Sequence, residues 1–177
     1  MTMTLDQFLG QISKRAFRFA ELGLRNRDDA LDAVQDAMLR MMRYKDTPSD
    51  EWSPLFWRIL RTRIIDIQRR SSFRLKWMFS NDVASRDPSS GEEFEPDWNG
   101  VEHDDPSGIL EAQQAYASLS NALTKLPARQ REAFFLRIIE QFDVAETAQI
   151  MGCSEGSVKT HLSRARAALG QALGMEL

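Results

Sequence analysis

The sequence contains a single cysteine, Cys153, among its 177 residues. One thiol cannot form an intramolecular disulfide, so a disulfide-stapled secreted scaffold is excluded. No stretch approaches the about 18 consecutive apolar residues that a membrane-spanning helix requires. Residues 1–15 also lack the charged-then-apolar pattern of a secretory signal. We therefore expect a cytoplasmic protein that does not insert into a membrane.

Residues for catalysis or metal binding are equally scarce. The two histidines, His103 and His161, lie in different segments with no nucleophile near them. Cys153 and His161 lack the two further ligands of a closed zinc site, so Cys153 is better interpreted as a small buried residue in a turn. The glycines are scattered and form no phosphate-binding loop. We expect no catalytic residues, no metal and no cofactor, which argues against an enzyme acting on nucleic acid.

Charge is segregated along the chain. The net charge is −3 overall, but residues 1–80 carry +5, residues 81–112 carry −9 and residues 113–177 carry +1. The acidic stretch within residues 81–108 is rich in Pro and Gly and shows almost no apolar periodicity, which is typical of a flexible linker. We therefore predict two domains, residues 1–80 and 109–177, joined by an acidic flexible linker over residues 81–108.

Apolar residues recur at helical spacing on both sides of this linker, and no segment shows the alternation of a strand. The sequence predicts an all-α fold of two small helical domains. Pro54 is expected at the first position of a helix, and Asp28 and Asp29 are expected to cap one. The expected helices are Leu5–Phe19, Ala30–Tyr44, Leu55–Arg70, Ile109–Leu126, Ala128–Ile139, Val144–Met151 and a last helix to about Leu173.

The last third of the chain predicts a helix-turn-helix unit. Val144, Ala148 and Ile150-Met151 give its first helix an apolar face, and Gly152 suits the tight turn. Ser154 is a suitable N-cap for the second helix, on which Val158, Leu162, Ala165 and Leu169 share one side. The other side can donate hydrogen bonds to base edges and phosphates in a major groove. The alternative is a solvated face of an ordinary amphipathic helix. The candidate DNA-binding residues are Lys159, Thr160, Ser163, Arg164 and Arg166.

A second basic helix precedes the linker. Between Arg58 and Lys76 there are seven basic residues and one acid. The spacing predicts that Phe56, Trp57, Leu60, Ile64 and Ile67 face inward. Flanking aromatics (Trp52, Phe73, Trp77, Phe79) would suit a single strand whose bases stack on rings, whereas the alternative is a solvated basic helix with core aromatics. The candidate residues on the outward side are Arg58, Arg61, Thr62 and Arg69, followed by Arg70.

The helix Ala30–Arg43 carries a mixed polar face. We predict that Ala30, Leu31, Val34, Met38 and Met41 face the core. Leu39 stands among polar residues on the other side, which is a small hint of a protein-binding surface, although a lone exposed Leu is normal. The candidate protein-binding residues are Asp32, Gln35, Asp36, Leu39 and Arg40.

These segments together resemble the extracytoplasmic-function group of bacterial RNA polymerase sigma factors, which keep regions 2 and 4. DDALDAVQDAMLRMMR (Asp28–Arg43) and LFWRILRTRIIDIQRR (Leu55–Arg70) are similar to region 2. LPARQREAFFLR (Leu126–Arg137) and AETAQIMGCSEGSVKTHLSRARAAL (Ala145–Leu169) are similar to region 4. The chain differs from the family at Leu31, where an acid is common, and at Thr62, where the family often has Asn.

The resemblance implies a role for each surface. The α-helical face with Leu39 would dock on the clamp helices of the polymerase β′ subunit, and the β flap is a further expected contact. The basic helix would open and hold the −10 element of promoter DNA. The last helix would read the −35 element, with Arg166 on phosphate. The family also commonly has an anti-sigma partner.

The leading interpretation is therefore a sigma factor that directs core RNA polymerase to promoters. The alternative is a stand-alone helix-turn-helix regulator with an N-terminal effector or dimerisation domain. Such a regulator binds DNA without polymerase, usually as a dimer with half-sites one helical turn apart. The basic N-terminal helix speaks against this alternative, because an effector domain does not need one.

Overall fold

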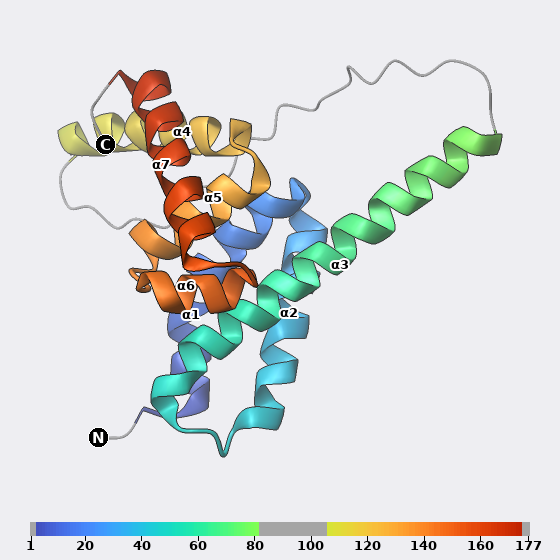
Figure 1. Cartoon of the computed structure of the whole chain (residues 1–177). Coiled ribbons are helices and arrows are strands. Elements are labelled where there is room, and N and C mark those ends of the chain that lie inside the picture. Colours follow the sequence, from blue (N-terminus) through green and yellow to red (C-terminus); the bar gives the residue numbers. More distant parts are fainter. Residues whose placement is uncertain (1–2, 82–105, 175–177) are drawn as a thin grey trace. The chain divides into compact units, whose positions relative to one another are not determined.

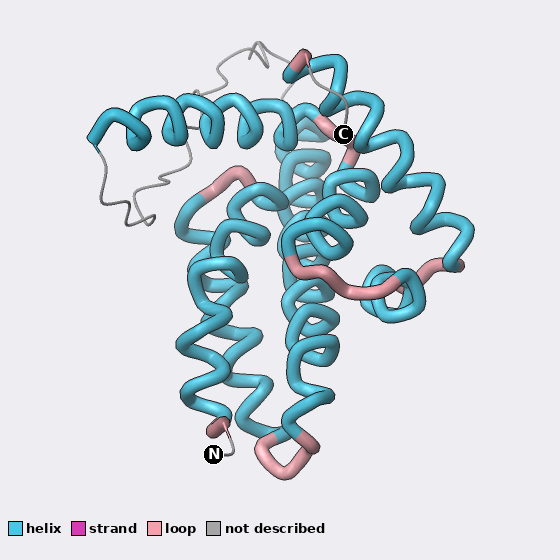
Figure 2. Tube along the Cα trace, turned by 90° about the vertical axis from the view of Figure 1, so that its left-hand side faces the viewer, coloured by secondary structure: helices cyan, strands magenta, loops and turns pink. Residues whose placement is uncertain are grey.

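A computed structural model describes residues 3–81 and 106–174, with side chains described for residues 3–72 and 114–174. The chain divides into two compact units, one within residues 1–94 and the other within residues 95–177. The described residues form helices joined by short loops and contain no strand (Figures 1 and 2). The predicted all-α fold is confirmed. The residues between 81 and 106, which carry most of the expected linker, lie outside the described part.

Unit 1 contains three long helices, α1 (Leu5–Leu24), α2 (Arg27–Met41) and α3 (Trp52–Asn81), which pack against one another (Figure 1). Two short 3-10 turns, η1 (Met42–Tyr44) and η2 (Ser49–Glu51), connect α2 to α3. Thr4 and Gln7 form a capping box at the start of α1. α1 extends beyond its predicted C-terminal bound, α2 beyond its N-terminal bound and α3 beyond both, because caps and tertiary packing set helix ends that periodicity does not resolve.

Two expected helix starts are corrected by the structure. Asn26 caps α2, accepting a 2.9 Å hydrogen bond from the amide of Asp29. Asp28 and Asp29 instead occupy the first turn, where their charges favour the positive end of the helix dipole. Pro54 is the third residue of α3 rather than the first. It is tolerated there because the first four amides of a helix have no intrahelical acceptor.

Aromatic rings dominate the core of unit 1. Phe8 of α1 lies 5.8 Å from Trp52, and Phe19 of α1 lies edge-on to Trp57 at 5.2 Å between ring centroids. Phe56 and Trp57 are fully buried. Such tilted and edge-on pairs contribute stabilisation beyond the apolar area that they bury. The α1–α3 contact is therefore held mainly by aromatic side chains.

Close backbone approach joins the other end of α1 to α3. A Cβ atom at Gly23 would lie 3.1 Å from Cγ2 of Ile64. Gln68 donates a 2.9 Å hydrogen bond to the Gly23 carbonyl, which the end of α1 leaves without a helical donor. Gly23 therefore sets how closely α3 can pack on α1.

Unit 2 contains α4 (Pro106–Lys125), α5 (Ala128–Phe134), a π-type turn η3 (Phe135–Ile139), α6 (Val144–Met151) and α7 (Glu155–Leu173). α7 packs against α4, α5 and α6. Val158, Ala165 and Leu169 bury the inner side of α7 as predicted, whereas Leu162 is half-buried. Val144, expected on the buried face of α6, is also only half-buried.

The turn between α6 and α7 has the predicted chemistry. Gly152 adopts a left-handed conformation with φ of 61°, which glycine reaches without a Cβ clash. Ser154 caps α7 by accepting a 3.2 Å hydrogen bond from the amide of Ser157. Cys153 is half-buried rather than buried. The helix-turn-helix bounds therefore agree with the sequence.

The connection between η3 and α6 was not foreseen. Gln141 has a positive φ of 59°, although it is not glycine. The amide of Glu140 bonds the carbonyl of Phe135, and that of Phe142 bonds Leu136. Asp143 and Glu146 then form a capping box that starts α6. This wide π-type turn and the residue with positive φ together redirect the chain into the helix-turn-helix.

Candidate nucleic-acid interface

The outer face of α7 presents polar and basic side chains. All five candidate residues of this helix are exposed, opposite the buried Val158, Ala165 and Leu169. The hydroxyl of Thr160 donates a 2.9 Å hydrogen bond to the Gly156 carbonyl, so its lone pairs remain available as acceptors. The exposed set is Lys159, Thr160, Ser163, Arg164 and Arg166.

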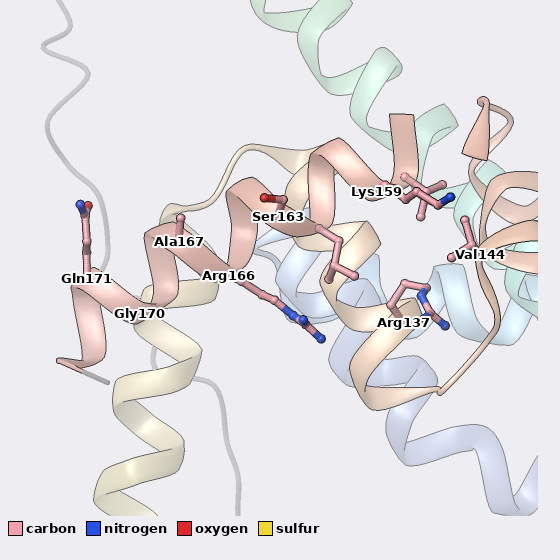
Figure 3. A pocket seen from close by; sticks show the side chains of 10 residues that line it. Arg137, Val144, Lys159, Ser163, Arg166, Ala167, Gly170 and Gln171 are labelled. Atoms are coloured by element: carbon pink, nitrogen blue, oxygen red, sulfur yellow. The ribbon is translucent and has the colours of Figure 1, made fainter. Parts of the chain in front are cut away.

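A groove of about 820 Å³ runs along one side of α7. Lys159, Ser163 and Arg166 line it from α7, and Arg137 lines it from η3 (Figure 3). Thr160 and Arg164 are not among the lining residues, so the candidate set divides between two sides of the helix. The remaining lining residues are Val144, Val158, Leu162, Ala167, Gly170 and Gln171.

Three arginines that sequence reasoning did not single out organise this unit. Arg129 donates a 2.7 Å hydrogen bond to the Met151 carbonyl at the end of α6. Arg131, which is buried, donates to the carbonyls of Thr124 and Leu126. Arg137 donates to the carbonyl of Phe142. Helix ends and turns leave such carbonyls without amide donors, and a guanidinium can supply several. In the sequence, the only indication of this role was that arginine recurs within the Leu126–Arg137 segment.

In unit 1, α3 carries the second basic face. Arg58, Thr62, Arg69 and Arg70 are exposed as predicted. Arg61 is not: only 9% of its surface is exposed, and it interacts with other groups of the protein. Its expected outward orientation was wrong, because the position lies at the edge of the stripe that packs on the other helices. The hydroxyl of Thr62 donates a 2.8 Å hydrogen bond to the Arg58 carbonyl.

One of the aromatic residues expected to stack on bases beside this helix lies in the core instead. Trp52 is buried in the core against Phe8. It therefore cannot stack on an extruded base without leaving the core. Ile67, expected to face inward, is half-buried. The side chains of Phe73, Trp77 and Phe79 lie outside the described residues.

The helix α2 differs from prediction at three positions. Asp36 forms a 2.6 Å ion pair with Arg63 of α3, so its charge is partly neutralised. Leu31 is 42% exposed rather than buried, and Met38 is half-buried, while Ala33 and Ala37 fill the core. Leu39 is 63% exposed, as its place among polar residues indicated.

Two further exposed apolar side chains lie in η1, directly after α2. Met42 is 57% exposed and Tyr44 is 43% exposed. Asp32, Gln35 and Arg40 are exposed around Leu39. Exposed apolar side chains with polar neighbours are typical of a protein-binding surface.

Across residues 3–81 and 106–174, no group of three or more His, Cys, Asp and Glu side chains could hold a metal ion. None of the described helices combines the length and the apolar character that a membrane span requires.

Comparison with known proteins identifies both halves. The family described as "Sigma-70, region 4" matches residues 116–169, which include the helix-turn-helix. The ECF RNA polymerase sigma factor SigM of Mycobacterium tuberculosis is 30% identical over 172 residues, covering 96% of this chain and 76% of SigM. The ECF RNA polymerase sigma factor EcfG of Rhodopseudomonas palustris is 31% identical over 171 residues, covering 95% of this chain and 83% of EcfG.

Solved structures share the fold. The sigma factor RpoE of Bartonella quintana, in complex with the anti-sigma factor NepR, matches with a TM-score of 0.69 at 24% identity, over 97% of this chain and 98% of that one. CnrH, in complex with the cytosolic domain of CnrY, matches with a TM-score of 0.57 at 20% identity, over 96% of this chain and 87% of that one.

The fold and the helix-turn-helix define a DNA-binding protein of the sigma-70 type. The chain belongs to the extracytoplasmic-function family of RNA polymerase sigma factors, and its function is in transcription initiation. Members of this family are transcription factors rather than enzymes.

Proposed function

We propose that this chain binds core RNA polymerase and directs it to promoters with two elements, one read by each unit. Residues 1–80 act as region 2 and residues 109–177 as region 4. The observation that carries the proposal is the exposed set on α7 from Lys159 to Arg166, opposite the buried side of a recognition helix. These side chains contact the −35 element in the major groove, as the family relationship supports.

The exposed face of α3 contacts the −10 element in this proposal. Arg58, Thr62 and Arg69 lie on one side of the helix, and Arg70 lies next to them. Cations on one helix face attract the sugar–phosphate backbone of an opened strand. Arg61 is omitted from this set because it is buried.

The α2 surface binds the polymerase clamp helices. Leu39 provides an exposed apolar contact, and Asp32, Gln35 and Arg40 supply polar contacts around it. Asp36 is held by Arg63 and contributes less charge than its sequence position indicated. The β flap is the second polymerase contact, and the cytoplasm is the place of action. An anti-sigma protein is a further expected partner, since the structurally similar RpoE of Bartonella quintana is seen in complex with the anti-sigma factor NepR.

The test is run-off transcription with purified core polymerase and genomic DNA templates. Specific transcripts that appear only when the full chain is added support the proposal, and their start sites supply the promoter sequence. The variant Arg164→Ala should lose selectivity for the −35 sequence, whereas Gln149→Ala, an exposed change on α6, serves as its control. Tight, dimeric promoter binding by the chain without polymerase would instead support a stand-alone regulator.

A further inference from the structure

Two exposed apolar side chains lie next to each other at the end of α2. Leu39 and Met42 are 63% and 57% exposed, more than any other large apolar side chain in the described part of the chain. Met42 belongs to η1, but its backbone stays helical, with φ of −60° and ψ of −22°. Residues three apart on a helix are neighbours on its surface. Met42 therefore continues, by about one turn, the α2 surface on which Leu39 lies.

The thioether of Met42 is open to solvent, whereas those of its nearest methionines are covered. Met41 is fully buried, and Met38 is half-buried. Elsewhere among the described side chains, Met151 is buried and Met3 is 36% exposed. A peroxide has to reach the sulfur atom before it can react, so exposure decides which methionines are oxidised first. On the α2 surface, that methionine is Met42.

Oxidation of a thioether by a peroxide is a balanced two-electron step. The sulfur attacks one peroxide oxygen, so that an S–O bond forms while the O–O bond breaks. The sulfur is oxidised to a sulfoxide, and hydrogen peroxide is reduced to water. The sulfoxide is polar where the thioether was apolar. A contact that buries Met42 then has to bury this oxygen as well, and a buried polar atom without a hydrogen-bond donor is unfavourable.

We propose that Met42 is a peroxide-reactive modification site, and that its sulfoxide lowers the affinity of this chain for core RNA polymerase. This inference rests on the proposed function of the α2 surface. It adds to that function a chemical modification that acts on the same contact. Methionine sulfoxide reductases convert the product back to methionine, so the loss of affinity is reversible. The chain that is already bound to polymerase keeps Met42 covered and reacts more slowly.

The experiment oxidises the full chain before polymerase is added. The chain is treated with hydrogen peroxide, catalase removes the excess, and a thiol reductant then restores the thiol of Cys153. Peptide mass spectrometry measures the sulfoxide at each methionine, and fluorescence titration measures the affinity for core polymerase. Oxidation at Met42 should weaken binding about tenfold, and sulfoxide reductases A and B should restore it. In the assembled holoenzyme, Met42 should be oxidised severalfold more slowly than in the free chain.

Three variants assign the effect to one sulfur atom. Met42→Leu has a similar volume and no sulfur, so its affinity after peroxide should equal its own affinity before treatment. Met42→Gln places a polar side chain of similar length there and should bind about tenfold more weakly than wild type without peroxide. Met3→Leu is the matched control, because it removes the other exposed methionine of the described residues. It should lose affinity on oxidation as wild type does.

Thermal unfolding separates modification of the surface from damage to the core. Because Met42 is exposed, the chain oxidised there should keep the wild-type melting temperature. Full oxidation at Met42 with unchanged affinity would overturn the proposal. So would a Met42→Leu chain that loses affinity on oxidation, or a loss of affinity that comes with a lower melting temperature, since oxidation of buried Met41 would explain the latter.

Leu39→Ala distinguishes this failure from failure of the proposed function. If Leu39→Ala weakens polymerase binding without peroxide and oxidation at Met42 does not, the α2 surface stands and the role of the modification is refuted. If Leu39→Ala, Met42→Gln and the oxidised chain all bind like untreated wild type, the proposed polymerase contact of α2 is itself refuted.

Discussion

Replacement of Arg61 by alanine should damage the stability of unit 1 rather than remove a DNA contact. Among the described residues of unit 1, Arg61 and Glu21 are the two buried charged side chains, and both interact with other groups. Removing a buried charged side chain leaves the groups that interacted with it buried and unpaired, which costs about 3 kcal/mol of unfolding free energy. At about 4–8 °C per kcal/mol for a unit of this size, the melting temperature should fall by about 12–24 °C.

Thermal unfolding followed by far-UV circular dichroism and by hydrogen exchange of α1–α3 peptides measures this effect. Arg58→Ala is the control, because Arg58 is exposed three residues earlier on the same helix. It should change stability by no more than about 0.5 kcal/mol but weaken binding to the −10 strand. The reasoning is refuted if Arg61→Ala melts like wild type and loses −10 binding as Arg58→Ala does.

Three further predictions concern other parts of the molecule. Gln141→Gly should raise the free energy of unfolding of unit 2 by about 1 kcal/mol in urea unfolding, because glycine adopts the left-handed conformation of this position without strain. The same change at Gln149, inside α6, should lower the free energy of unfolding by a similar amount. A change of the same sign for both variants would contradict this account. Gly23→Ala should lower the melting temperature of unit 1, because the new methyl lies 3.1 Å from Ile64; an unchanged melting curve would show that the helices separate freely. Leu39→Ala should weaken core polymerase binding about tenfold at unchanged stability, measured by fluorescence titration; an unchanged affinity would remove Leu39 from the proposed surface.

Local signals in the sequence determined the helical class and the helix-turn-helix. The turn at Gly152 and the cap at Ser154 depend on backbone preferences of residues close together in the chain. Periodicity likewise assigned Val158, Ala165 and Leu169 to the buried side of α7. The exposed state of Leu39 followed from its position among polar neighbours. These features need no knowledge of which helices are neighbours.

Tertiary packing decided the features that depend on a second helix. Arg61 is buried and Asp36 is paired with Arg63 because α3 lies against its neighbours at those positions. Arg137 enters the groove only because the π-turn brings η3 beside α7. The periodicity of a single helix predicts which of its sides is apolar. Which residues of another helix contact the edge of that side depends on packing between segments that are distant in sequence. For this reason the recognition helix was predictable from the sequence, whereas the second cationic wall beside it became visible only in the folded structure.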